Sequence, residues 1–127
     1  MKECINVKNL NKDYPEFSLR NLNFSVCQNS ITGFLGINGS GKTTTLKMLL
    51  GLINADQGEI TILGQNQKGM SRESINKHIG VVLDRSMFYE HLTGRQIMNI
   101  HKKAYDNWDD NVYQSCLQRF TIPENKK

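Results

Sequence analysis

Apolar and polar residues alternate over most of the first thirty positions. Segment 4–10 (CINVKNL) carries Ile5 and Val7 at every second position, and segment 18–26 (SLRNLNFSV) continues the same pattern. A period of two predicts two half-buried β-strands. The intervening segment 11–17, NKDYPEF, contains Asn, Asp and Pro and predicts a turn.

The pattern then switches between strand and helix. Short apolar runs predict strands over 30–36, 59–64 and 79–83. A helix is expected after the glycine-rich stretch, because Leu46, Leu49 and Leu50 recur at helical spacing and Gly51 can end it. We also expect a turn over 54–58 and a short helix over 71–78.

The last third of the chain has a helical pattern. Thr93 and Gln96 have the spacing of a capping box, with Leu92 and Ile97 as its hydrophobic staple, and predict a helix over 94–104. A second helix is expected over 107–120, starting near Asp109 or Asp110, ending before Pro123, and carrying one shared face: Val112, Cys116, Leu117 and Phe120.

Composition narrows the class of protein. The 127 residues have the length of one domain, and 38% hydrophobic with 22% charged residues argues against disorder. No apolar run reaches the roughly 18–20 residues that span a bilayer, and the first residues lack the apolar stretch of a signal peptide, so we expect a cytosolic protein. The three scattered cysteines indicate neither zinc nor disulfides, and the scattered net charge of +4 does not favour nucleic acid as a partner.

The strongest chemical signal is residues 36–43, GINGSGKT, which match G-x-x-x-x-G-K-[ST] in full. The glycines let backbone N–H groups turn inward around phosphate oxygens. Lys42 is expected to reach the β- and γ-phosphates, and the Thr43 hydroxyl is expected to bind Mg²⁺. The apolar segment before the loop and the helical pattern after it fit a phosphate-binding loop. No N-K-x-D motif follows the loop, and this favours ATP over GTP.

Taken together, the loop and its flanks resemble the ATP-binding subunit of an ABC transporter of the small bacterial exporter type. Besides the loop, GLINADQGEITILG, HIGVVLDRSMFYEHLTGRQIMNI and NWDDNVYQSCLQRF are similar to successive regions of that family. The resemblance implies an α/β P-loop NTPase fold, namely the N-terminal portion of an ABC ATPase. Within the partial domain 1–127 it implies an antiparallel β part (1–30 and 58–64), a βαβ P-loop core (31–57 and 75–84) and the start of the helical subdomain (88–127).

The resemblance also assigns roles to residues. Tyr14 matches the aromatic residue that stacks on adenine, and Asp84 occupies the position where the family usually has a glutamine near Mg²⁺. We therefore expect metal contacts from Thr43 and Asp84, phosphate stabilisation by Lys42, and nucleotide contacts from Tyr14, Gly36, Asn38, Gly39, Ser40, Gly41, Lys42, Thr43 and Thr44. Asp84 is a departure from the family pattern, but a carboxylate can also hold Mg²⁺ or a bound water.

Two alternatives remain. Residues 81–84, VVLD, also fit a Walker B strand ending in a metal-binding aspartate, which would make the protein a self-contained small P-loop NTPase or kinase. A non-transport ABC-class ATPase is the other. The segment that follows Asp84 favours the transporter interpretation.

Several parts of a complete ABC ATPase are not found in the sequence: the L-S-G-G-Q-type signature, the strand ending in Asp-Glu and the later histidine. We therefore expect a chain truncated before the signature, which binds Mg-ATP without turning it over. In the full-length protein, the resemblance implies a dimer of ATP-binding subunits, membrane-spanning partner subunits and a location at the inner face of the membrane.

Overall fold

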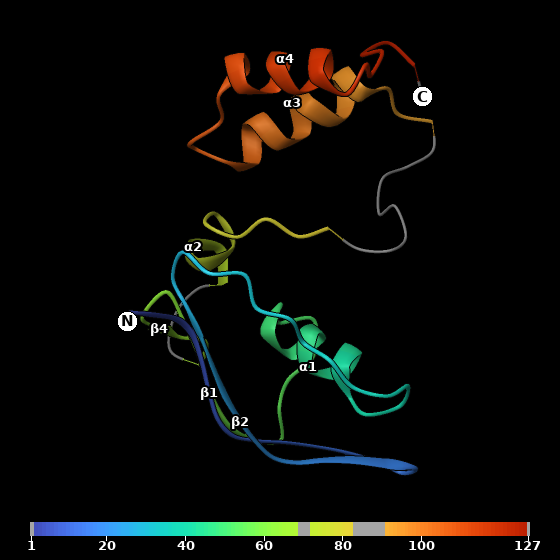
Figure 1. Ribbon diagram of the computed structural model, residues 1–127. Coiled ribbons are helices and arrows are strands. Elements are labelled where there is room, and N and C mark those ends of the chain that lie inside the picture. Colours follow the sequence, from blue (N-terminus) through green and yellow to red (C-terminus); the bar gives the residue numbers. More distant parts are fainter. Residues whose placement is uncertain (1, 69–71, 83–90, 127) are drawn as a thin grey trace. The chain divides into compact units, whose positions relative to one another are not determined.

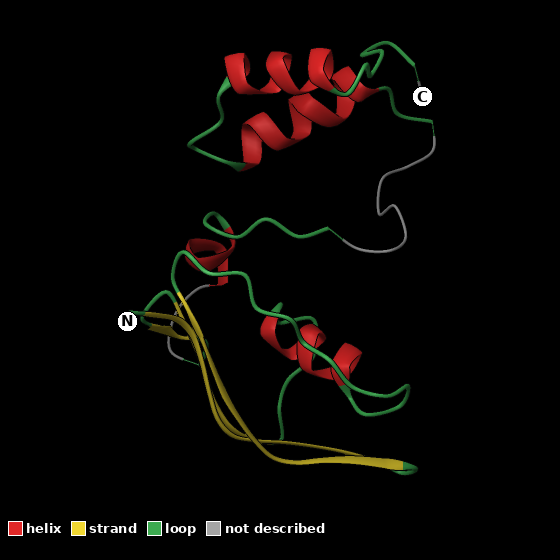
Figure 2. Cartoon of the chain, viewed as in Figure 1, coloured by secondary structure: helices red, strands yellow, loops and turns green. Residues whose placement is uncertain are grey.

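The computed structural model describes residues 2–68, 72–82 and 91–126. The chain forms two compact units, residues 1–75 and 76–127, and each is considered by itself. The first unit contains a sheet and one longer helix, and the second is helical (Figures 1 and 2).

The sheet of the first unit is entirely antiparallel. Its strands are β1 (Glu3–Tyr14), β2 (Phe17–Cys27), β3 (Gln57–Ile62) and β4 (Gln65–Asn66), in the order β2-β1-β3-β4. The strands predicted at 4–10, 18–26 and 59–64 are confirmed. The predicted turn at 11–17 is too long, because β1 and β2 stay paired up to Tyr14 and Phe17 and leave only two residues between them.

Strands β1 and β2 bend along their length (Figure 1), and the register of their pairing shifts near several asparagines. Asn9 and Asn21 both have a φ of 47°, the left-handed conformation that asparagine tolerates better than most residues. The side chains of two neighbouring asparagines bond to their backbone N–H groups: the Asn23 Oδ1 accepts from the Asn9 N–H at 2.8 Å, and the Asn11 Oδ1 accepts from the Asn21 N–H at 2.8 Å. The register shifts between Val7 and Leu10 and between Leu10 and Lys12 therefore do not leave these donors unsatisfied.

Helix α1 (Lys42–Leu49) shares the core of the first unit with the sheet. Its Thr45 and Met48 are 1% exposed, and Met48 lies beside the strand residues Leu10 and Ile60. The other buried apolar residues of the unit are Val7, Leu19, Ile62 and Ile75. The helix ends as predicted at Gly51 (φ 68°), with the Leu52 N–H bonded to Lys47 O and the Gly51 N–H bonded to Met48 O.

Two predicted strands do not form. Residues 30–36 and 79–82 carry no strand, and position 83 lies outside the described residues. Ile31, Leu35 and Val82 have exposed fractions of 104%, 93% and 98%. A strand exists only when a neighbour supplies its hydrogen-bond partners, and no described segment pairs with either of these two. The apolar pattern identified strand-forming residues but could not show whether a neighbour pairs with them.

The second unit consists chiefly of α3 (Gly94–Ala104) and α4 (Asp110–Arg119), while the short α2 (Arg72–Asn76) spans the boundary of the two units. The predicted capping box is confirmed: Thr93 accepts from the Gln96 N–H, and the Gln96 side chain accepts from the Thr93 N–H at 2.8 Å. Asp109 caps α4 by accepting from the N–H groups of Asn111 and Val112. The expected staple between Leu92 and Ile97 stays a prediction.

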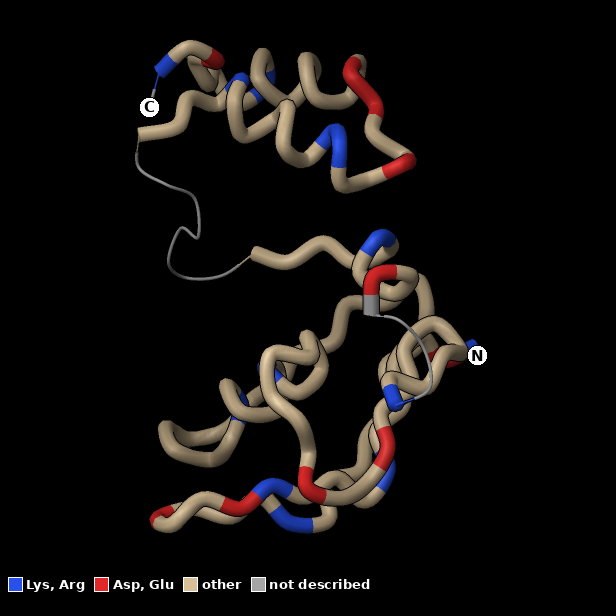
Figure 3. The backbone as a smooth tube through the Cα atoms, turned by 180° about the vertical axis from the view of Figure 1, so that it is seen from behind, with Lys and Arg blue, Asp and Glu red and all other residues tan. Residues whose placement is uncertain are grey.

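Neither α3 nor α4 contains a buried residue. Val112 and Phe120 of the predicted apolar face are 59% and 64% exposed, whereas Tyr113 and Leu117 are half-buried. No helix among the described residues is long and apolar enough to cross a membrane. Basic and acidic positions are interspersed along the backbone of each unit (Figure 3).

Candidate nucleotide-binding site

The glycine-rich loop connects β2 to α1 and is held in an open turn. The Ser40 N–H donates to Ile37 O at 3.2 Å, and Gly39 and Gly41 have φ angles of 83° and 94°. A Cβ at Gly36 would lie 2.5 Å from Ser40 Oγ, so the backbone and that hydroxyl occupy the space a side chain would need. Residues 36–40 of the loop are all exposed, so their backbone N–H groups are accessible, as a phosphate cradle requires.

Gly41 anchors this loop to the sheet. A Cβ there would lie 2.7 Å from Leu19 Cδ1 and 2.8 Å from Phe17 Cζ. The left-handed φ favours glycine at this position, and any side chain there would have to displace the ends of Leu19 and Phe17. The start of α1 is thereby held against the tip of the β1–β2 hairpin.

Lys42 lies over the loop it belongs to. Its Nζ donates to Gly36 O at 2.5 Å and to Ile37 O at 2.8 Å. The ammonium group is thus held at the centre of the loop by weak neutral acceptors. Phosphate oxygens carry full negative charge and form stronger, charge-assisted bonds with an ammonium group than carbonyls do. Lys42 can exchange these partners for phosphate without leaving the loop.

The first turn of α1 adds backbone donors. No side chain caps the helix at Gly41, and the first N–H groups of a helix have no partner within it. These groups and the helix dipole favour an anion at this end. The Thr45 side chain does not occupy this anion-binding end of the helix, because its hydroxyl donates to Gly41 O at 2.9 Å inside the core.

A pocket of about 500 Å³ joins the loop to the hairpin tip. Its lining residues come from the loop and α1 (Asn38, Gly39, Gly41, Lys42, Thr43 and Thr44) and from the hairpin (Glu16 and Phe17). The sequence did not identify Glu16 and Phe17 as site residues. Their position after Tyr14 and Pro15 in a hairpin was the available signal.

Tyr14 lies at the same hairpin tip but does not line this pocket. Its side chain is 41% exposed and forms the last β1–β2 pair with Phe17. The expected stacking of Tyr14 on adenine therefore stays a prediction, and so do the nucleotide contacts expected of Ser40 and the other loop residues.

The donor set fits a phosphate-bound Mg²⁺ better than a protein-bound metal. Thr43 is exposed and lines the pocket beside Lys42, so its hydroxyl can face a metal held mainly by phosphates. Among the described residues, no group of His, Cys, Asp and Glu could hold a metal by itself. Asp84, the other expected metal contact, lies outside the described residues.

The fold and the loop together define a P-loop nucleotide-binding protein. The model of the family described as "ABC transporter" matches residues 19–127. A solved structure described as the ATP-binding subunit of an ABC transporter matches 97% of this chain and 53% of its own, with a TM-score of 0.84 and 23% sequence identity. The chain belongs to the ABC transporter ATP-binding family, and its predicted fold class is confirmed.

Individual ATP-binding proteins of bacteria are similar to between about half and all of this chain. A bacitracin transport ATP-binding protein of Bacillus licheniformis is 42% identical over 111 residues, which cover 81% of this chain and 36% of the relative. The bacitracin transport protein of Enterococcus faecalis is 36% identical over 100% of this chain and 41% of its own. A zinc uptake ATP-binding protein of Listeria monocytogenes is 44% identical over 53% of this chain. The chain thus spans about two fifths of the length of the bacitracin relatives.

Proposed function

We propose that this chain is the Mg-ATP-binding portion of an ABC transporter ATPase. The observation that carries the proposal is the loop itself: an open glycine turn, a lysine ammonium held 2.5 and 2.8 Å from loop carbonyls, and an uncapped helix start. These features provide backbone and ammonium donors for phosphate in one place.

Each part of the nucleotide has a proposed partner. Lys42 and the backbone of residues 36–44, including the loop positions Asn38, Gly39, Ser40 and Gly41, bind the β- and γ-phosphates. The hydroxyl of Thr43 contacts Mg²⁺, which shields the charge of the phosphates. Tyr14 at the hairpin tip stacks on adenine, because a flat and partly exposed ring suits a base. Asp84 contributes to the metal or to its water.

We propose further that the 127-residue chain binds ATP without hydrolysing it, because the sequence has no Asp-Glu strand end and no signature. In the whole protein, two ATP-binding subunits close around ATP and drive membrane-spanning subunits. The chain then lies at the inner face of the membrane through those subunits. Export of bacitracin or a similar compound is favoured over zinc, because the bacitracin relatives match more of the chain.

Titration calorimetry of the 127-residue chain with Mg-ATP tests binding. We expect saturable binding to the original chain and a loss of about tenfold or more in affinity for Lys42→Ala, because a charge-assisted bond contributes roughly 1.5–3 kcal/mol. The matched control is Lys47→Ala, which removes an exposed lysine from the last turn of the same helix.

Two results would contradict the proposal. One is equal affinity of the original chain and Lys42→Ala. The other is steady phosphate release by the pure chain that Lys42→Ala abolishes, because it would show that the chain carries its own hydrolytic residues. That second result would support a self-contained NTPase instead.

A further inference from the structure

Tyr14 has a cation beside its ring. The Lys12 Nζ lies 5.7 Å from the centroid of the Tyr14 ring, within the roughly 6 Å over which a cation attracts an aromatic face. The two residues are both on β1 and two positions apart, so their side chains leave the strand on the same side. The Lys12 side chain is only 18% exposed, whereas Tyr14 is 41% exposed.

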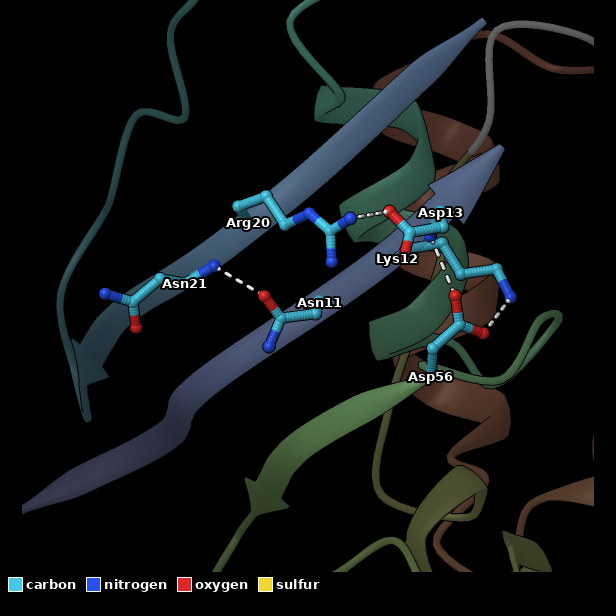
Figure 4. Close-up of polar contacts among 6 residues, drawn as sticks. All are labelled: Asn11, Lys12, Asp13, Arg20, Asn21 and Asp56. Atoms are coloured by element: carbon cyan, nitrogen blue, oxygen red, sulfur yellow. Dashed lines mark hydrogen bonds and ion pairs between the residues drawn. The ribbon is translucent and has the colours of Figure 1, made fainter. Parts of the chain in front are cut away.

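Asp56 holds this lysine in place. From the turn before β3, its Oδ1 accepts from the Lys12 Nζ at 2.7 Å and its Oδ2 accepts from the Asp13 N–H at 2.7 Å (Figure 4). The Asp56 N–H in turn donates to Asn11 O at 3.0 Å. One residue therefore binds three consecutive positions of the strand that leads to Tyr14.

The other edge of the same strand segment is also fixed. Arg20 on β2 pairs with the Asp13 carboxylate at 2.8 Å, and the Asn21 N–H donates to Asn11 Oδ1 at 2.8 Å (Figure 4). The hydrogen bond between Lys12 and Asp56 raises the pKa of Lys12 and lowers the pKa of Asp56, which favours the charged form of each.

We propose that Lys12 and Asp56 are positioning residues for the nucleobase: Asp56 holds the Lys12 ammonium against the Tyr14 ring, which fixes the ring for stacking on adenine. The proposal rests on the function proposed above. A ring restrained before binding loses less freedom when the base arrives, and preorganisation of this kind raises affinity. Neither residue lines the pocket at the glycine loop, where the phosphates are proposed to bind.

The test compares two ligands that differ in the base. The chain is titrated with Mg-ATP and with magnesium and inorganic tripolyphosphate, which carries the phosphates alone. We expect Lys12→Met to weaken ATP binding about two- to fivefold and tripolyphosphate binding by less than twofold. Asp56→Asn should produce the same split, and Lys12→Arg should restore ATP binding because it keeps the cation. Lys8→Met, on an exposed position of the same strand, is the matched control and should change neither affinity.

A second comparison isolates the ring. In a Tyr14→Ala background, Lys12→Met should have no further effect on ATP affinity, since there is no ring left to position. A merely structural ion pair would instead weaken both ligands alike, or weaken ATP equally with and without Tyr14, and either result overturns the proposal. If the original chain binds neither ligand, the proposed function fails; if it binds tripolyphosphate and ATP equally, only the role of the base and of its positioning residues fails.

Discussion

The two units of this chain are stabilised in different ways. All buried apolar residues of the described chain lie within residues 1–75, where β1 pairs with β3 across about fifty residues of sequence. The helices α3 and α4 of residues 76–127 bury no residue; caps, exposed ion pairs and half-buried side chains such as Tyr113 hold them. The phosphate loop thus belongs to the unit that has a core. A loop that must hold its backbone donors in place benefits from such a support.

The largest effect is expected from a change in that core. Leu10 is 0% exposed, and Leu10→Ala should lower the free energy of unfolding of the first unit by about 3 kcal/mol through lost burial and a cavity. Chemical denaturation followed by circular dichroism measures this. Leu52→Ala, at a side chain 60% exposed, is the control and should cost less than about 0.5 kcal/mol. Equal effects of the two changes would show that the core is not where the structure places it.

A substitution at Gly58 tests one close backbone contact within the sheet. Gly58 has a φ of 94°, and a Cβ there would lie 2.4 Å from Asn9 O, a backbone atom that cannot move aside easily. Gly58→Ala should therefore destabilise the first unit by about 2–3 kcal/mol. Gly64→Ala shares the left-handed φ (79°) but meets nothing within 4 Å, so it should cost only about 1 kcal/mol. Thermal unfolding of the two variants side by side measures the contribution of the close contact.

The second unit should respond most to its caps. Asp109→Ala removes the acceptor for two N–H groups of α4, and Thr93→Ala removes half of the capping box of α3. Each should cost about 1 kcal/mol, measured by the fluorescence of Trp108, the single tryptophan of the chain. Ser115→Ala, exposed within α4, is the control. If Asp109→Ala and Thr93→Ala leave the unfolding free energy unchanged while Ser115→Ala lowers it, the caps do not stabilise these helices.

The smallest expected effect is a slight loss of stability at acidic pH. Bonds from Lys102 and the Trp108 indole lower the pKa of Asp110 below its ordinary 3.8. A lowered pKa in the folded state means that the ionised Asp110 stabilises the fold at neutral pH. This contribution to stability is lost as the pH falls below about 4. Trp108 fluorescence should show a small acid-induced change that is absent in Asp110→Asn. A change of the same size in both proteins would assign the transition to another carboxylate.

Local signals in the sequence predicted local structure well. The alternation in β1 and β2, the capping box at Thr93 and the glycine stop at Gly51 each depend on residues within one turn or one strand, and each is confirmed. The family resemblance rested on several segments together, and the family match over residues 19–127 confirms it.

What could not be predicted depends on neighbours distant in sequence. The bend of the sheet needs Asn9 and Asn23 to meet across two strands, and an alternating pattern gives no sign of it. Phe17 and Glu16 join the pocket only because the hairpin turn is shorter than the pattern suggested. The apolar run at 30–36 has strand-forming residues, but whether a partner strand pairs with them is not encoded in the run itself.

The central claim is that the glycine loop binds the phosphates of ATP. The most direct measurement is nuclear magnetic resonance of the ¹⁵N-labelled chain titrated with Mg-ATP, following the backbone amides of residues 36–44. We predict that the amides of Gly39, Gly41 and Lys42 shift most, that Tyr14 shifts with them, and that amides of α4 do not. Shifts confined to residues outside the loop, or none at millimolar Mg-ATP, would contradict the account.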